Sequence, residues 1–185
     1  MSVTTTLAFT VLAVAALWAW WIYNRLVRAR NLTAAAFSDI DVQLERRHDL
    51  IPRLVESVKA YAQYERATLT AVTELRDRSR AAAKLADKAI IENEIEQATH
   101  RLIALAESYP DLKANTTFLN LQSELADTEN QLQYARRFYN GAVRDYNTGL
   151  QSFPDTLLAR AFGFTEKEFF IANPDAAAPV SVSLD

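Results

Sequence analysis

The chain has no cysteine, three glycines, five prolines and two histidines among its 185 residues. The absence of cysteine excludes a disulfide framework and thiolate metal sites. No glycine-rich loop is present to hold phosphates and no serine stands in a Gly-x-Ser-x-Gly elbow, so nucleophilic catalysis finds no support. Acidic and basic residues are interspersed with a net charge of −3, which leaves no basic stripe for nucleic acid. Strong helix formers dominate the composition and predict an all-α protein.

An uncharged stretch runs from Ser2 to Asn24, and its apolar part extends from Leu7 to Ile22. A helix over that apolar part spans roughly 24 Å, which its flanks extend toward the thickness of a bilayer's hydrocarbon core. No basic residue precedes the run and no Ala-x-Ala cleavage site follows it directly, so we predict a retained transmembrane anchor; a cleaved signal peptide and a buried core helix are the alternatives. The predicted anchor residues are Leu7, Phe9, Val11, Leu12, Val14, Leu17, Trp18, Trp20, Trp21, Ile22 and Tyr23.

The residues after the anchor indicate its orientation. Tryptophan and tyrosine rings settle at the headgroup layer, so the aromatic cluster marks one interface, and Arg25, Arg28 and Arg30 form a lipid-facing basic flank beyond it. Positive flanks tend to stay in the cytoplasm. We therefore expect the N-terminus outside and the helical domain in the cytoplasm, with a periplasmic domain as the alternative.

The rest of the chain divides into a helical bundle domain at 31–172 and a flexible tail at 173–185, after an anchor region at 1–30. Apolar residues recur at three and four positions from Phe37 to Leu75, which predicts one long amphipathic helix continuous with the anchor. Pro52 lies inside this helix and predicts a kink between Asp49 and Pro52, because proline removes a backbone hydrogen bond. Asp49, three residues earlier, could cap a new helix start there.

Two more long helices and short closing elements follow. We predict a helix from Ala81 to Ser108, with Glu92 and its acidic neighbours largely off the apolar stripe. A third helix, capped by Asn115, carries a heptad seam from Phe118 to Tyr146. This seam suits packing within one chain, and contact between subunits is the alternative.

A short helix starts at Phe153-Pro154-Asp155 and stops at Gly163. Thr165 and Glu168 then have the spacing of a capping box before a last apolar segment.

Both histidines stand near glutamates. Glu45 and His48 share the Glu-x-x-His spacing that di-iron bundles use, and Glu96 precedes His100 by four residues. A metal-binding bundle enzyme is therefore a rival hypothesis, although such bundles use two full motifs and two further glutamates. The preferred interpretation has no metal and no cofactor, with His48 at a helix boundary and His100 on a solvated or partly packed face.

Arginine clusters and an aromatic run mark possible partner surfaces. The arginines suit inter-helix ion pairs, recognition of a partner's carboxylates or contact with anionic lipid. The aromatic residues suit a core stripe or a polar-aromatic groove that binds a peptide or a neighbouring subunit. The possible partner-binding residues are Arg46, Arg47, Arg136, Arg137, Phe138, Tyr139, Asn140 and Tyr146.

Five segments of the sequence are distinctive: residues 23–27, 39–52, 109–115, 134–140 and 145–147. Together they closely resemble the bacterial LemA family. The resemblance extends from Tyr23 to about Phe170 and implies one membrane helix followed by an antiparallel bundle of long helices. It implies no catalytic residues, because the family's activity is not established, and it suggests a scaffold or adaptor at the bacterial envelope.

These observations lead to one preferred function and two rivals. We expect a non-enzymatic scaffold of the bacterial inner membrane, with a single membrane span, that binds a protein partner or self-associates. The first rival is a membrane-organising oligomer that binds anionic lipid, and the second is the metal-binding bundle. We expect no nucleic-acid partner, and no small-molecule substrate is evident.

Overall fold

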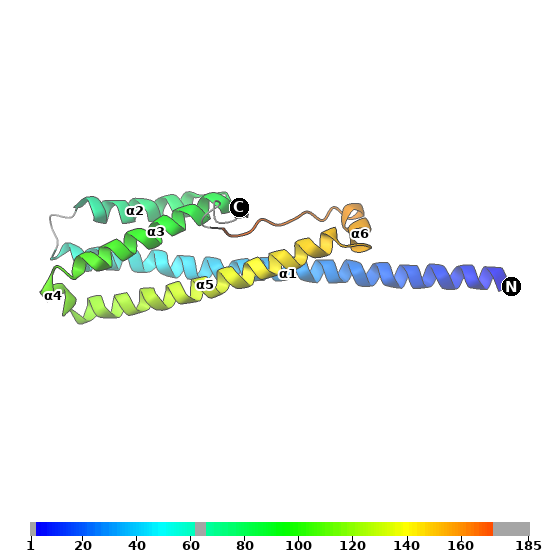
Figure 1. The fold of residues 1–185 in the computed structure, drawn as a ribbon, viewed down its shortest axis with the longest axis horizontal. Coiled ribbons are helices and arrows are strands. Elements are labelled where there is room, and N and C mark those ends of the chain that lie inside the picture. The colour runs from blue at the N-terminus through cyan, green and yellow to red at the C-terminus, as the bar shows by residue number, and fades with distance from the viewer. Residues whose placement is uncertain (1–2, 62–65, 172–185) are drawn as a thin grey trace, which may run out of the picture. The chain divides into compact units, whose positions relative to one another are not determined.

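A computed structural model describes residues 3–61 and 66–171 of the protein (Figure 1). Every regular element in those ranges is a helix. The predicted all-α fold, with a long apolar N-terminal helix and an antiparallel bundle, is confirmed. The helices are α1 Val3–Lys59, α2 Arg66–Ala81, α3 Leu85–Ala106, α4 Pro110–Lys113, α5 Thr116–Gln151 and α6 Asp155–Ala161.

The chain forms two compact units, and α1 and α5 contribute to both. The first unit comprises Met1–Asp39 and Arg137–Phe169, and the second comprises Ile40–Arg136 and Phe170–Asp185. The domain boundaries predicted at residues 30 and 172 remain predictions. The tail predicted at 173–185 lies outside the described residues.

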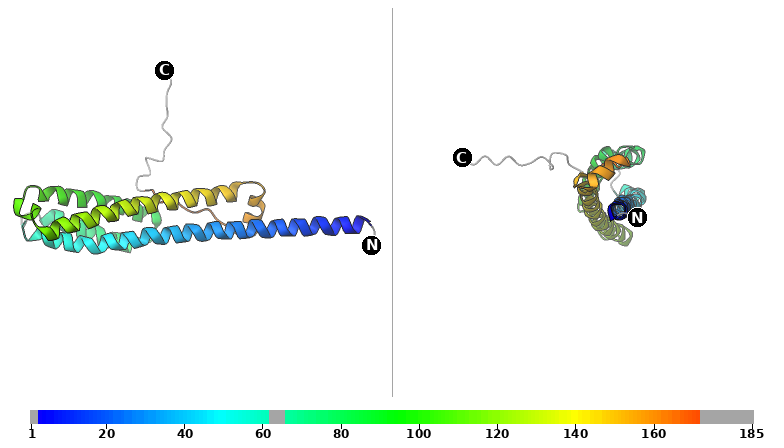
Figure 2. Two further views of the ribbon diagram at one scale, coloured as in Figure 1. Left: turned by 90° about the horizontal axis from the view of Figure 1, so that it is seen from below. Right: turned by 90° about the vertical axis from the view of Figure 1, so that its right-hand side faces the viewer.

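The first unit is built where α1 packs against the end of α5 and against α6. Its core contains Ile22 and Leu26 of α1, Tyr146 and Leu150 of α5, and Ala159 of α6. Figure 2 shows α6 beside α1, with the N-terminal part of α1 extending beyond it as a single helix. The free stretch therefore ends where Ile22 enters the core.

The second unit is an antiparallel bundle formed by parts of α1 and α5 together with α2 and α3 (Figure 1). Its larger apolar cluster takes Leu54 and Val58 from α1, Leu102 from α3 and Leu121 from α5. A second cluster joins Ile51 of α1 to neighbours on α2 and α3. Consecutive helices alternate in direction, as short connections between packed helices require.

The anchor continues into the bundle without a break, as predicted, because α1 is one helix across Pro52. Asp49 therefore does not begin a new helix. The prediction of a single helix as far as Leu75 is wrong, since α1 ends at Lys59 and a separate α2 begins at Arg66. No proline or glycine between the two helices signals that the chain reverses here. The reversal allows Val72 of α2 to pack against Ile51, Ile95 and Ala98.

Helix α5 begins as the sequence predicts. The Asn115 side-chain oxygen accepts hydrogen bonds from the backbone N–H groups of Thr117 and Phe118, at 2.9 and 3.1 Å, and so satisfies donors that the helix leaves unpaired. Most of the seam is buried within this chain, including Phe118, Leu132 and Tyr146. Packing within one chain therefore accounts for the heptad pattern.

The closing elements agree with the sequence in part. Helix α6 covers Asp155–Ala161, and Gly163 after it has a φ of 68°, a backbone conformation that favours glycine. The capping box predicted from Thr165 and Glu168 is wrong, because residues 164–171 are not helical. Backbone hydrogen bonds to α5 side chains hold this segment instead, and we call residues 164–170 the strap.

Candidate functional site

A cluster of charged side chains lies inside the second unit. Arg47 and His48 of α1 are each 2 % exposed, and Glu92 of α3 is fully buried. Ser79 of α2 is buried beside them, and Glu129 of α5 completes the cluster. Four helices thus place polar groups at one point in the bundle, where an unpaired charge would be costly.

Glu92 is the centre of this cluster. One carboxylate oxygen lies 2.7 Å from His48 Nε2 and also accepts a hydrogen bond from the Ser79 hydroxyl. The other lies 3.1 Å from Arg47 Nη2. A single buried carboxylate therefore joins α1, α2 and α3.

Helix α5 joins the cluster through Glu129. One oxygen of its carboxylate lies 3.2 Å from Arg47 Nη1. Nearby, Arg136 pairs with Glu96 at 3.7 Å, and its guanidinium lies over the Phe170 ring with 5.1 Å to the centroid. Two arginines thus alternate with three carboxyl groups across α1, α3 and α5.

The surroundings move the pKa values of two carboxyl groups in opposite directions. Burial pushes the pKa of Glu92 upward, but the His48 hydrogen bond and the Arg47 charge outweigh it and hold the value below normal. Burial raises the pKa of Glu129, and the neighbouring Glu96 adds to this, against the opposing charge of Arg47. Burial, with the like charge of Arg47, lowers the pKa of Arg136. Glu92 is therefore held as an anion, whereas Glu129 retains its proton to higher pH.

Pro52 supplies a further contact between α1 and α2. A helix normally bonds the N–H of one residue to the carbonyl four positions earlier, and proline has no N–H. The His48 carbonyl, four residues before Pro52, instead accepts a hydrogen bond of 2.8 Å from Arg76 Nε of α2. The proline thus frees an acceptor at which α2 docks.

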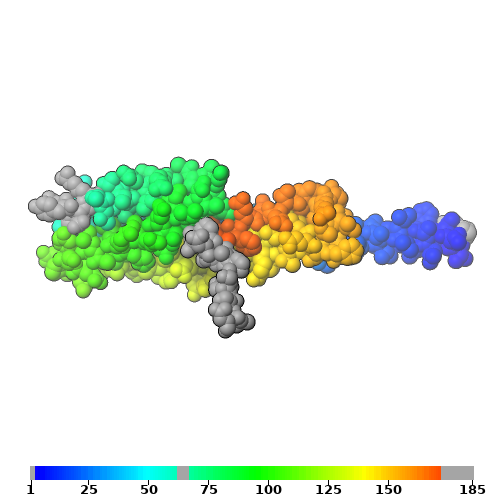
Figure 3. Space-filling model, turned by 45° about the horizontal axis from the view of Figure 1, so that its top comes forward, coloured from blue at the N-terminus to red at the C-terminus, as the bar shows by residue number. Residues whose placement is uncertain are grey.

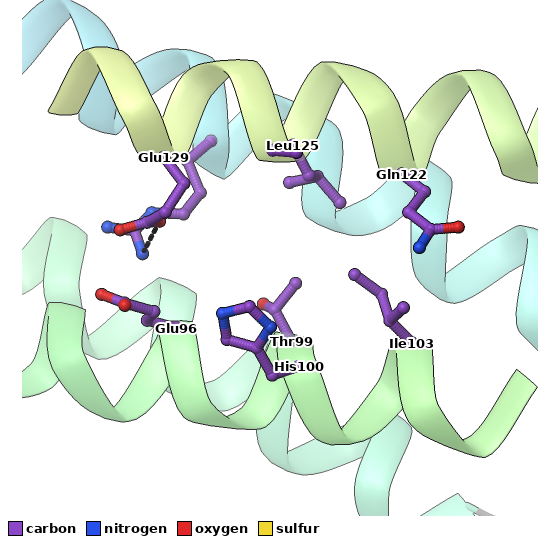
Figure 4. Close-up of a pocket in the computed structure, with 9 residues that line it drawn as sticks. Glu96, Thr99, His100, Ile103, Gln122, Leu125 and Glu129 are labelled. Atoms are coloured by element: carbon purple, nitrogen blue, oxygen red, sulfur yellow. Dashed lines mark ion pairs between the residues drawn. The ribbon is translucent and has the colours of Figure 1, made fainter. Parts of the chain in front are cut away.

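A cavity of about 150 Å³ lies beside the cluster, between α3 and α5. Figure 4 shows Glu96, Thr99 and His100 of α3 facing Leu125 and Glu129 of α5 across it. Because a cavity needs only about 10–15 Å³ of such space to hold one water molecule, this cavity has room for water.

The arrangement does not bring together the histidines and glutamates of the rival metal-site hypothesis. His48 is buried and bound to Glu92, whereas His100 is exposed at the cavity. The expectation that His48 lies at a helix boundary is wrong, because it is in the interior of α1. Within residues 3–61 and 66–171, no group of three or more potential metal-binding side chains comes together.

The charges of the cluster are paired with one another across different helices. Sliding one helix along another would leave a buried charge unpaired, which is costly. The sequence interpretation missed Glu92, which was placed off the apolar stripe. A signal was present, because Glu92, Ile95, Thr99, Leu102 and Ala106 follow one another at alternating spacings of three and four, and all are buried.

The anchor residues divide between free and packed positions. The side chains from Leu7 to Trp18 are exposed, as are Trp20 and Trp21. Ile22 is 1 % exposed in the core of the first unit, and the Tyr23 ring contacts Phe162 at 4.9 Å between centroids. By length and apolar composition, α1 is the one helix among the described residues that could cross a membrane.

The basic flank makes contacts within the first unit. Arg25 pairs with the buried Asp155 and lies over the Trp21 ring. Arg30 lies over the Phe164 ring, 5.5 Å from its centroid. Arg28 is exposed, and its Nε donates to a backbone carbonyl one turn earlier.

Two predicted partner-binding aromatics hold the strap. The Tyr139 and Tyr146 hydroxyls donate to the backbone carbonyls of Glu168 and Thr165, at 2.8 and 3.1 Å. Asn147 adds two hydrogen bonds of 2.9 Å to the backbone of Lys167. Both tyrosines have raised pKa values, because burial disfavours their charged form. These side chains thus bind an extended peptide that belongs to the same chain.

The remaining predicted partner residues lie in different environments. Arg47 is buried and forms inter-helix ion pairs, one of the alternatives that the sequence left open, and the side chain of Arg136 is largely buried. Arg46, Arg137 and Phe138 are exposed.

Comparison with known proteins identifies the family. The chain is similar to magnetosome protein MamQ of Magnetospirillum gryphiswaldense, with 25 % identity over 184 residues that cover 85 % of this chain and 68 % of MamQ. Magnetosome protein MamQ 1 of Paramagnetospirillum magneticum matches to the same extent. Protein LemA of Metamycoplasma hominis is 24 % identical over 161 residues, covering 86 % of this chain and 74 % of that protein. The family model of LemA matches residues 36–184, and the chain therefore belongs to the LemA family.

Proposed function

We propose that this protein is a membrane-anchored, non-enzymatic scaffold of the bacterial envelope, which binds a protein partner or self-associates. One observation carries the proposal. From Val3 to Trp21 the apolar side chains of α1 are exposed, except that of Ala19, which is half-buried, whereas α1 is packed into a folded domain from Ile22 onward.

The length of the free stretch supports a membrane span. From Val3 to Trp21 the helix measures roughly 28 Å at its usual rise, close to the hydrocarbon core of about 30 Å. An apolar helix exposed to water on all sides would be unfavourable, and lipid chains remove that cost. The domain then starts at the level of the interface.

The arrangement of the polar cluster supports the non-enzymatic part of the proposal. Catalytic groups need access to a substrate and a reacting partner within hydrogen-bond reach. Glu92, Arg47 and His48 are instead enclosed and bound to one another. LemA is not known as a family of enzymes.

The charge distribution supports the proposed orientation. Arg25, Arg28 and Arg30 follow the span, and no basic side chain precedes it, which favours a cytoplasmic domain. A periplasmic domain is the alternative.

Two exposed positions are suited to detecting the partner. Val42 of the second unit is 62 % exposed and lines a surface groove with Arg46. Phe138 of the first unit is 55 % exposed on α5. Phenylalanine and arginine are enriched at protein interfaces.

Photo-crosslinking in native membranes tests the proposal. We would place a photoreactive amino acid at Val42 or Phe138 of the full chain, with Lys113 at the exposed end of α4 as the control position. We expect a discrete adduct from at least one test position and a weaker or absent one from Lys113. Recovery of monomer alone from both test positions would contradict the scaffold.

The rival hypothesis of an oligomer that binds anionic lipid receives less support. It relies on three arginines after the membrane span, and two of them, Arg25 and Arg30, already make contacts inside the first unit. Equal association of the full chain with vesicles that contain or lack phosphatidylglycerol is therefore expected, and strong dependence on that lipid would favour the rival.

A further inference from the structure

We propose that α6 and its flanking residues form a second membrane contact, in which Phe153, Leu157 and Phe162 enter the boundary between headgroups and hydrocarbon beside the anchor. This inference rests on the proposed function, because it requires α1 to span the bilayer. It adds a surface in the folded domain whose partner is lipid.

The first observation is the position of α6 along α1. The Phe162 ring contacts Tyr23, at 4.9 Å between centroids, and Asp155 pairs with Arg25. Ala159 packs in the same core as Ile22. All these contacts lie within the first unit and fix α6 at the level where the free apolar stretch ends.

That level is the interface of the proposed span. Trp18, Trp20 and Trp21 are exposed and stand immediately before Ile22, and tryptophan rings gather at the headgroup layer. Because α6 packs against the next turn of α1, it must lie at the same depth as this aromatic cluster or just outside it. Figure 3 shows the segment around α6 next to the start of the free part of α1.

The second observation is the outward surface of this segment. Phe153, Leu157 and Phe162 are 80 %, 61 % and 59 % exposed. Leu158 and Ala159 face inward and pack on α1 and α5. The segment therefore has an apolar surface on its outside as well as its inside, which is unfavourable in water and suits the acyl boundary.

The contacts of Asp155 hold the segment in this position. Asp155 is buried, and its partner Arg25 also lies over the Trp21 ring. The ion pair thus links the start of α6 directly to the interfacial part of α1. A rigidly held helix presents its apolar side chains at a fixed depth, so it can act as a stop that sets how far the anchor sinks.

Single spin labels on the full chain test the inference, and the absence of cysteine makes each label unique. The test variants are Phe153→Cys and Leu157→Cys, since both side chains are exposed and their replacement leaves the core intact. Leu12→Cys is the control for a label in the anchor. Asp145→Cys, at a side chain on α5 that is 75 % exposed, is the control for a label in water. Each variant is reconstituted into vesicles of phosphatidylethanolamine and phosphatidylglycerol.

Power saturation compares relaxation by oxygen, which concentrates in lipid, with relaxation by a water-soluble nickel chelate. We expect the labels at 153 and 157 to favour oxygen as the Leu12 label does, and the label at 145 to favour nickel. If the Leu12 label favours oxygen while the labels at 153 and 157 favour nickel, this inference is overturned but the proposed membrane anchor is retained. A water-like Leu12 label would overturn both.

The same labels distinguish lipid from a second copy of the chain. Dipolar broadening at 153 or 157 that disappears on dilution with unlabelled protein would show that the surface is a protein contact, and would overturn the proposal. Low accessibility to both oxygen and nickel would overturn it as well.

Discussion

Arg76 of α2 donates a hydrogen bond of 2.8 Å to the backbone carbonyl of His48, the acceptor that Pro52 leaves without its helical partner. A double-mutant cycle can measure this relationship. We expect Arg76→Ala to cost about 1–3 kcal/mol in the parent, because the carbonyl is left unsatisfied. In a Pro52→Ala background the restored N–H of residue 52 can donate to the His48 carbonyl, so Arg76→Ala should cost less there.

Chemical denaturation in detergent micelles would measure the four free energies of unfolding. We expect Pro52→Ala alone to fold as the parent does. Arg78→Ala, on the same helix but 62 % exposed, should shift stability little. Additive effects of Arg76→Ala and Pro52→Ala would contradict the proposed coupling.

The buried Glu92 carboxylate predicts a large effect from a small change. Glu92→Gln keeps the shape of the side chain but removes one of the two carboxylates that pair with Arg47, the one at 3.1 Å, and leaves only Glu129 at 3.2 Å. Breaking a buried ion pair costs about 3–5 kcal/mol. Glu94→Gln is the matched control, because its pair with Arg78 is exposed and should contribute less than about 1 kcal/mol. Equal denaturation midpoints for Glu92→Gln and Glu94→Gln would refute a stabilising role for the buried Glu92 carboxylate.

Acid should weaken the fold through the same residue. The folded pKa of Glu92 lies below its ordinary value, so its contribution to stability is present above the ordinary value and is lost as pH falls through the lowered one. Unfolding free energies measured across that acidic range should decline in the parent. The decline should be shallower in Glu92→Gln. If the dependence of stability on pH is unchanged in this variant, Glu92 is not the residue responsible for the acid sensitivity.

Glu129 predicts the opposite dependence. Its pKa is raised in the folded state, so its contribution is complete below the ordinary value and is lost as pH rises through the raised one. We expect Glu129→Gln to flatten the fall in stability over that upper range. Asp127→Asn, an exposed substitution two residues earlier, is the matched control.

Asn147 holds the strap through two hydrogen bonds to the backbone of Lys167. We expect Asn147→Ala to speed hydrogen exchange at the Lys167 amide about fivefold to tenfold, as the loss of a bond worth about 1 kcal/mol implies. Thr148→Ala, at an exposed neighbouring position, is the control. Unchanged exchange at Lys167 in Asn147→Ala would show that the strap is held by other contacts.

The side of the membrane that carries the domain can be read from a single cysteine. We expect Asp127→Cys, exposed on α5, to react with an impermeant maleimide only after spheroplasts are opened, as the positive flank of the span requires. Labelling of intact spheroplasts would place the domain on the outer side of the membrane.

Sequence periodicity predicted α5 well and the end of α1 poorly. The seam from Phe118 to Tyr146 and the Asn115 cap are local signals, because spacing and capping involve residues within one helix. The reversal after Lys59 has no such signal. It occurs because α2 gains a packing surface against α3, which only the assembled bundle provides.

The sequence by itself determined the all-α class, the free apolar stretch of α1 and the family, since each depends on composition or on contiguous patterns. Only the tertiary structure decided that Arg47 and Glu92 lie in the core and that Tyr139 and Tyr146 hold the strap. The reason is physical. A charged residue at a helical spacing is compatible with solvent or with a buried partner, and the partner is Glu92, 45 residues from Arg47 along the chain, brought within reach by folding.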